Sequence, residues 1–71
     1  MLLVIGTENC SRCAMVKNIL NTKNINYNYK LIDELSETEQ NNYLDIAKQS
    51  GQLSYPMIFK NNKIITIQEV Q

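Results

Sequence analysis

Apolar and polar positions in the first half of the chain predict a strand, a helix and a second strand. Residues 2–5 are all apolar and are followed by Gly6, as in a short strand that is buried on both faces. Between residues 11 and about 23, apolar side chains recur at helical spacing, at Met15, Val16, Ile19 and Leu20. Residues 25–31 then alternate between apolar or aromatic and polar side chains. This period of two predicts a strand whose more apolar face carries Ile25, Tyr27, Tyr29 and Leu31.

A second helix is predicted to follow this alternating strand. Ser36 and Glu39 have the spacing of a capping box, in which the side chain of each residue bonds to the backbone N–H of the other. Gly51 then offers a place for the helix to stop. The apolar side of this helix is supplied by Tyr43, Leu44 and Ala47. We interpret the tyrosines in these elements as core or half-buried packing residues.

The last part of the chain predicts a β-hairpin. Residues 56–60 and residues 63–67 flank Asn61 and Asn62, and asparagine tolerates the positive φ of a tight two-residue turn. Pro56 opens the first of these runs, where a missing N–H donor costs least. The order strand, helix, strand, helix, hairpin predicts an α/β fold with a mixed sheet of four strands. The first two strands should be parallel, with a right-handed crossover, and the residues after 67 suffice only to begin a last helix.

Composition narrows the class of protein. The chain has 71 residues, enough for one domain (residues 1–71) with a small core. Seven basic and seven acidic residues cancel, which argues against a surface for nucleic acid. The apolar residues 2–5 are too few for a membrane span or a signal peptide. We therefore expect a monomer in the reducing cytoplasm, with no membrane partner.

The pair Cys10-Ser11-Arg12-Cys13 is the most specific chemical signal in the chain. These are the only two cysteines, and they lie where the first strand gives way to the first helix. Unpaired N–H groups at a helix start favour thiolate over thiol, with pKa values of roughly 3.5 to 7.5 at such sites. Arg12 adds positive charge and Glu8 opposes it. Because Cys10 is on the solvent side, we predict that it attacks disulfides and that Cys13, one turn inside, resolves the product.

Other interpretations of the cysteine pair remain open on this pattern. A disulfide across so short a loop restricts the unfolded chain little, so stabilisation is a poor reason for the pair. Cys10 and Cys13 could also supply two of the four thiolates of a zinc or iron–sulfur site. The chain has no other cysteine and no histidine, so we expect no metal site within one chain, and a metal would require a dimer. The third possibility is a non-catalytic module that docks a partner beside Tyr55.

Taken together, these segments resemble the glutaredoxin family of the thioredoxin fold. The resemblance covers nearly the whole chain and depends on the cysteine pair followed, some forty residues later, by Tyr55-Pro56 before a short strand. It implies an oxidoreductase without a bound cofactor that reduces protein disulfides or glutathione mixed disulfides. In that family the first cysteine is the nucleophile, the second resolves, and a cis-proline supports the substrate. These roles fall on Cys10, Cys13 and Pro56, with Tyr55 beside the substrate.

Departures from the family pattern concern the glutathione pocket. Glu8 stands where many glutaredoxins have a lysine, and Arg12 where they usually have tyrosine. The usual Thr-Val before the cis-proline is Ser54-Tyr55, and the expected glycine pair is Thr66-Ile67. We therefore predict that Arg12, Tyr55, Pro56, Thr66 and Ile67 line the substrate site and that glutathione, as reductant or substrate, binds poorly.

The last helix of the fold is expected to be missing or vestigial in this chain, and its compact length also resembles NrdH-type redoxins. Redoxins of that type donate electrons to ribonucleotide reductase and receive them from thioredoxin reductase. The resemblance thus implies these two enzymes as candidate substrate and reductant.

Overall fold

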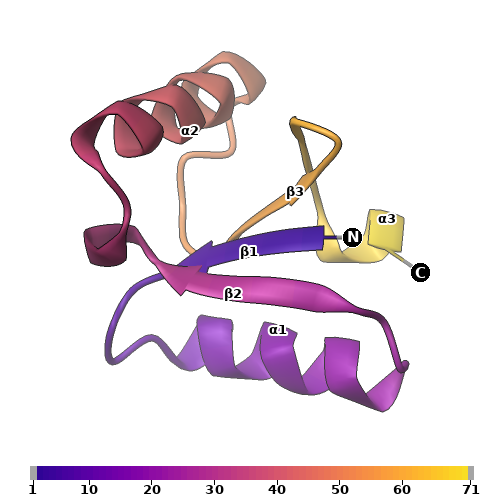
Figure 1. The fold of residues 1–71 in the computed structure, drawn as a ribbon. Helices are drawn as coiled ribbons and strands as arrows, with labels where there is room; N and C mark the ends of the chain where they lie inside the picture. Colours follow the sequence, from indigo (N-terminus) through magenta and orange to yellow (C-terminus); the bar gives the residue numbers. More distant parts are fainter. Residues whose placement is uncertain (1, 71) are drawn as a thin grey trace.

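A mixed sheet of four strands, in the order β2-β1-β3-β4, forms the centre of the molecule (Figure 1). The structure is a computed structural model that describes residues 2–70. Its elements are β1 (Leu2–Gly6), α1 (Ser11–Thr22), β2 (Tyr27–Leu31), a 3-10 turn (Ile32–Glu34), α2 (Glu37–Ser50), β3 (Met57–Lys60), β4 (Lys63–Ile65) and α3 (Ile67–Val70).

The strand directions confirm the predicted mixed sheet. β1 and β2 are parallel, with Val4 opposite Tyr29, because a helix connects them. β3 runs antiparallel to β1, and β4 is antiparallel to β3. This arrangement brings the end of β1, from which the cysteine loop departs, beside the beginning of β3.

The helices cover the two faces of the sheet, and Figure 1 shows α2 above the strands and α1 below them. Alternation along β1 divides the core accordingly. On the α1 side, the buried cluster consists of Leu2, Val4, Val16, Leu20 and Ile58. On the α2 side, it consists of Ile5, Ile32, Leu35, Ala47, Met57 and Phe59. Each cluster joins a helix to the central strands, so packing against the sheet holds each helix in place.

The predicted ends of α2 are confirmed. The backbone N–H of Glu39 donates to Ser36 Oγ over 3.2 Å, and the N–H of Ser36 donates to Glu39 Oε1 over 3.2 Å. At the other end, Gly51 adopts a φ of 71°, the left-handed conformation in which glycine is least strained.

Replacing Ser36 by alanine is expected to lower the free energy of unfolding by about 1 kcal/mol, because the N–H of Glu39 loses its acceptor. Urea unfolding monitored by circular dichroism measures the change. Ser50, the exposed last residue of α2, provides the control. Ser50→Ala should leave stability unchanged or slightly higher, and equal losses in the two variants would contradict the capping role.

The hairpin turn is also as predicted. Asn61 and Asn62 have φ values of 52° and 65°. Positive φ at both central residues belongs to the turn whose twist matches that of two paired strands. The two asparagines therefore set the register of β3 and β4 without a glycine.

Several predicted boundaries are wrong by one or two residues. β3 begins at Met57, one residue after Pro56, and β2 begins at Tyr27 because Ile25 takes part in the cap that follows α1. The N–H of Ile25 donates to the carbonyl of Leu20 over 3.0 Å, and Asn24 has a φ of 57°. These are the bonds and conformation of a Schellman motif, which ends a helix by turning the chain back on its last carbonyls.

Met15 is a second departure from the predicted pattern. Its spacing placed it with Val16 and Leu20, but its side chain is 61% exposed, whereas those two are buried. The buried stripe of α1 is therefore narrower than the apolar pattern, and Met15 stays at the surface near the cysteine loop.

Candidate functional site

The two cysteines lie where β1 leads into α1. Cys10 is the N-cap of α1, with an extended backbone, and Cys13 lies in the first turn. Their sulfurs are joined as a disulfide across Cα atoms 5.3 Å apart. The side chain of Cys13 is only 2% exposed, whereas Cys10 is half-buried. The pair is thus asymmetric, and Cys10 is the member that an approaching disulfide meets first.

Polar groups at the start of α1 are directed at Cys10. The backbone N–H of Cys13 donates to Cys10 Sγ over 3.1 Å, as a side-chain cap would require. The first turn of α1 holds no acidic residue, and Arg12 within it is exposed. When the disulfide is reduced, this N–H and the helix dipole stabilise a thiolate at Cys10.

Asn9 turns the chain into this position. Its φ is 56°, in the left-handed region that asparagine accepts more readily than most residues. The turn lets the chain leave β1 and present Cys10 at the head of α1 within only a few residues.

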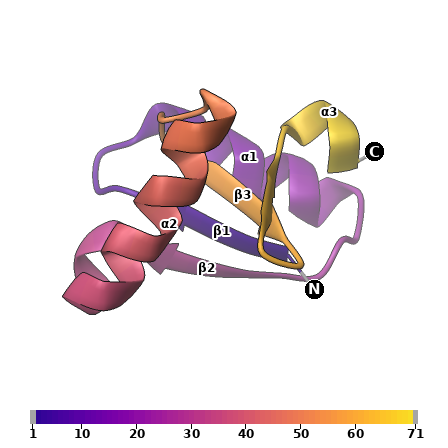
Figure 2. The same ribbon diagram turned by 90° about the horizontal axis from the view of Figure 1, so that it is seen from above.

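The peptide bond between Tyr55 and Pro56 is cis, as the family resemblance implied. It lies in the segment between α2 and β3, which Figure 2 shows beside the start of α1. Arg12 and these two residues line the same groove, so chain segments more than forty residues apart meet here.

A groove of about 540 Å³ brings together all five residues predicted for the substrate site: Arg12, Tyr55, Pro56, Thr66 and Ile67. Most of its other lining side chains are apolar, among them Met15, Ile64 and Ile65. Arg12 is the only charged residue among the described residues that line it. Neither cysteine is among the described residues that line the groove, but Arg12, which does line it, lies between the two cysteines in sequence.

Thr66 has a structural duty that the sequence prediction missed. Its N–H donates to Glu69 Oε1 over 3.3 Å, and the N–H of Glu69 donates to Thr66 Oγ1 over 3.4 Å. This is a capping box for α3, so β4 ends at Ile65 and not at residue 67 as predicted. Thr66-x-x-Glu69 has the same spacing as Ser36-x-x-Glu39, so the signal was present in the sequence.

Gly6, at the end of β1, marks a close approach of two functional groups. A Cβ added to it would overlap the hydroxyl oxygen of Tyr29 and would lie 2.8 Å from Cys13 Sγ. Only glycine leaves room there for both atoms. The Tyr29 hydroxyl from β2 and the buried Cys13 sulfur therefore both lie close to the same point above Gly6, which the sequence pattern did not indicate.

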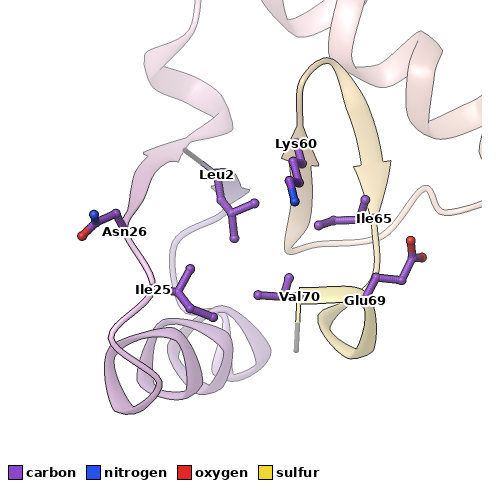
Figure 3. Close-up of a pocket in the computed structure, with 7 residues that line it drawn as sticks. All are labelled: Leu2, Ile25, Asn26, Lys60, Ile65, Glu69 and Val70. Carbon is purple, nitrogen blue, oxygen red and sulfur yellow. The ribbon is translucent and has the colours of Figure 1, made fainter.

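A second cavity, of about 360 Å³, lies at the other end of β1 (Figure 3). Leu2, Ile25 and Val70 point towards one another across it, and Lys60 and Glu69 contribute the charged part of its lining. It contains none of the residues predicted for the redox site.

Among residues 2–70, no cluster of three or more histidine, cysteine, aspartate or glutamate side chains could hold a metal ion. None of the helices in that same range combines the length and apolar character needed to cross a bilayer.

A disulfide-forming cysteine pair at the start of α1, a cis-proline that shares a groove with Arg12 and a mixed four-stranded sheet define a thioredoxin-fold thiol–disulfide oxidoreductase. A model of the glutaredoxin family matches residues 2–65. The chain belongs to the glutaredoxin family.

Solved structures share the fold. The glutaredoxin of Methanosarcina mazei Go1 superposes with a TM-score of 0.76 at 20% identity, over 97% of this chain and 72% of its own. For the holo form of glutaredoxin C1 from Populus tremula x tremuloides these values are 0.70, 25%, 97% and 68%. For Methanosarcina acetivorans methanoredoxin they are 0.68, 22%, 97% and 78%. A search of curated proteins found no match.

Proposed function

We propose that this oxidoreductase reduces disulfides of protein substrates, with Cys10 as nucleophile and Cys13 as resolving thiol. The observation that carries the proposal is the asymmetry of the pair. Cys10 is half-buried and accepts an N–H bond at the start of α1, whereas Cys13 is 2% exposed. In this proposal the accessible, stabilised thiolate of Cys10 attacks the substrate, and the buried thiol of Cys13 then resolves the mixed disulfide.

The reaction proceeds by two exchanges. The Cys10 thiolate attacks one sulfur of the substrate disulfide, forms a mixed disulfide and releases the other substrate sulfur as a thiolate. Cys13, as thiolate, then attacks Cys10 Sγ and displaces the second substrate sulfur. The substrate leaves with two thiols after taking up protons, and the protein keeps the Cys10–Cys13 disulfide. An external dithiol restores the reduced pair by the reverse route.

The groove supports a protein segment as the substrate. Its lining is largely apolar, and among residues 2–70 Arg12 is the only charged residue in it. Beside Tyr55 and Pro56, an extended segment can pair with the backbone while its apolar side chains contact Thr66 and Ile67. We infer that the substrate carries its disulfide in an apolar stretch, and ribonucleotide reductase is a candidate through the resemblance to NrdH-type redoxins.

For the reductant we propose a thioredoxin reductase in preference to glutathione. Glutathione carries two carboxylates and needs cationic or backbone partners for them. Within the described part of the chain, Arg12 is the one cation that lines the groove, Glu8 is exposed near the cysteines, and the N–H of Thr66 is already bonded to Glu69. We also propose that residues 1–71 form a single domain. In this proposal the protein is a monomer, holds no bound cofactor and acts in the cytoplasm.

Two coupled assays test this proposal with insulin as the disulfide substrate. We expect the rate with NADPH and thioredoxin reductase to exceed the rate with glutathione and glutathione reductase by about tenfold or more, a difference of roughly 1.4 kcal/mol in transition-state stabilisation. Glu8→Lys restores the charge found in many glutaredoxins. It should raise only the glutathione-dependent rate, by a few-fold.

The opposite result is also informative. Efficient turnover of the wild type at millimolar glutathione would contradict the preference for thioredoxin reductase. Absence of reduction in both assays would contradict the proposed function itself.

A further inference from the structure

The buried sulfur of the redox pair has a phenol beside it. Apart from the chain neighbours of Gly6, the atoms nearest to a Cβ built on that glycine are the Tyr29 hydroxyl oxygen, Cys13 Sγ and Tyr29 Cζ. The hydroxyl oxygen of Tyr29 and the sulfur of Cys13 therefore both lie close to the position that a Cβ of residue 6 would occupy. Tyr29 approaches from β2 and Cys13 from α1, on the same face of the sheet.

The proposed exchange reaction places a negative charge on Cys13. When a reductant attacks Cys10 Sγ, the Cys13 sulfur leaves as a thiolate, and in the forward reaction it must be a thiolate to attack. Because Cys13 is 2% exposed, water offers little solvation. The helix start does not supply the missing partner, since the N–H of Cys13 is directed at Cys10 Sγ. A buried thiolate without a donor is costly.

Tyr29 is held in a position from which its hydroxyl can serve as a donor for the Cys13 thiolate. Its backbone on the edge strand β2 pairs with Val4 of the inner strand β1. The ammonium of Lys17 lies 4.2 Å from the centroid of its ring, in a cation–π contact that fixes the ring against α1. Lys17 is one helical turn beyond Cys13, so the same face of α1 positions both the sulfur and the ring.

We propose that the Tyr29 hydroxyl donates a hydrogen bond to Cys13 Sγ when this sulfur is reduced, and so stabilises the thiolate that leaves or attacks. In the disulfide, the sulfur is a weak acceptor; reduction turns it into a strong one. No bond to Tyr29 forms or breaks, and the electrons still pass only between sulfurs. The inference rests on the proposed roles of Cys10 and Cys13, and it adds Tyr29 to the reaction.

The test removes only the hydroxyl, with Tyr29→Phe, which keeps the ring and its contact with Lys17. The first measurement is the rate at which dithiothreitol opens the Cys10–Cys13 disulfide. We expect this rate to fall about tenfold, as for the loss of a hydrogen bond to a charged group. The second is a titration of Cys13, followed by its 13Cβ resonance, in the Cys10→Ser background. There Tyr29→Phe should raise the pKa of the Cys13 thiol.

Tyr27→Phe is the matched control. Tyr27 lies two residues earlier on β2, on the same face and also half-buried, but its hydroxyl donates to Asn21 Oδ1 over 3.2 Å. It should change neither the rate nor the titration. If Tyr29→Phe behaves like Tyr27→Phe in both measurements, the inference is wrong. Neither measurement uses a protein substrate, so failure of the proposed function would show separately, as a wild type that does not reduce insulin.

Discussion

Cys10→Ser is expected to abolish disulfide reduction, with a loss of about a thousandfold or more relative to the wild type. A serine hydroxyl keeps the cap at the start of α1 and accepts the N–H of Cys13 as the sulfur does. It does not ionise near neutral pH, so no nucleophile remains to attack the substrate. Reduction of insulin, followed by turbidity under dithiothreitol, measures the loss.

Cys13→Ser is the matched control for this variant. Because Cys10 remains, the first attack should proceed and stop at the mixed disulfide, which mass spectrometry detects as a stable adduct of protein and substrate. A stable adduct on Cys10→Ser and none on Cys13→Ser would reverse the two roles. Wild-type rates in both variants would remove the redox function altogether.

Local patterns predicted the parts of this site that a short segment determines. The apolar run of β1, the helical spacing after Ser11 and the cysteine spacing together placed Cys10 at a helix start, and the structure confirms that position. The asparagine turn and the Ser36 capping box are equally local and are equally confirmed. In each case, the residues that carry the signal are also the residues that make the bond.

Two features of the structure were not predicted from the sequence, for different physical reasons. The capping box from Thr66 to Glu69 was visible in the sequence, but the apolar side chains of Ile64, Ile65 and Ile67 favoured a longer strand over a helix start. The approach of Tyr29 to Cys13 has no local signal. It depends on the parallel register of β1 with β2 and on where α1 crosses them, which only the assembled sheet determines.

Gly6→Ala is expected to lower the free energy of unfolding by about 2 to 3 kcal/mol, because overpacking a filled site forces its neighbours to move. The new methyl would overlap the Tyr29 hydroxyl and would press on Cys13 Sγ at 2.8 Å. The end of β1 cannot shift freely, since β2 and β3 flank it. Urea unfolding of the oxidised and reduced proteins measures the loss, and both forms should show it.

Gly51, the other glycine of the chain, separates crowding from backbone conformation. A Cβ there meets no atom of the described residues within 4 Å, but its φ of +71° disfavours alanine. Gly51→Ala should therefore lose about 1 kcal/mol through the backbone alone and leave the rate at which dithiothreitol opens the disulfide unchanged. Gly6→Ala, by contrast, should also alter the rate at which dithiothreitol opens the disulfide, because it displaces the sulfur or its phenol partner. A Gly6→Ala protein with wild-type stability and exchange rate would show that the phenol, the sulfur and the strand are not packed as described.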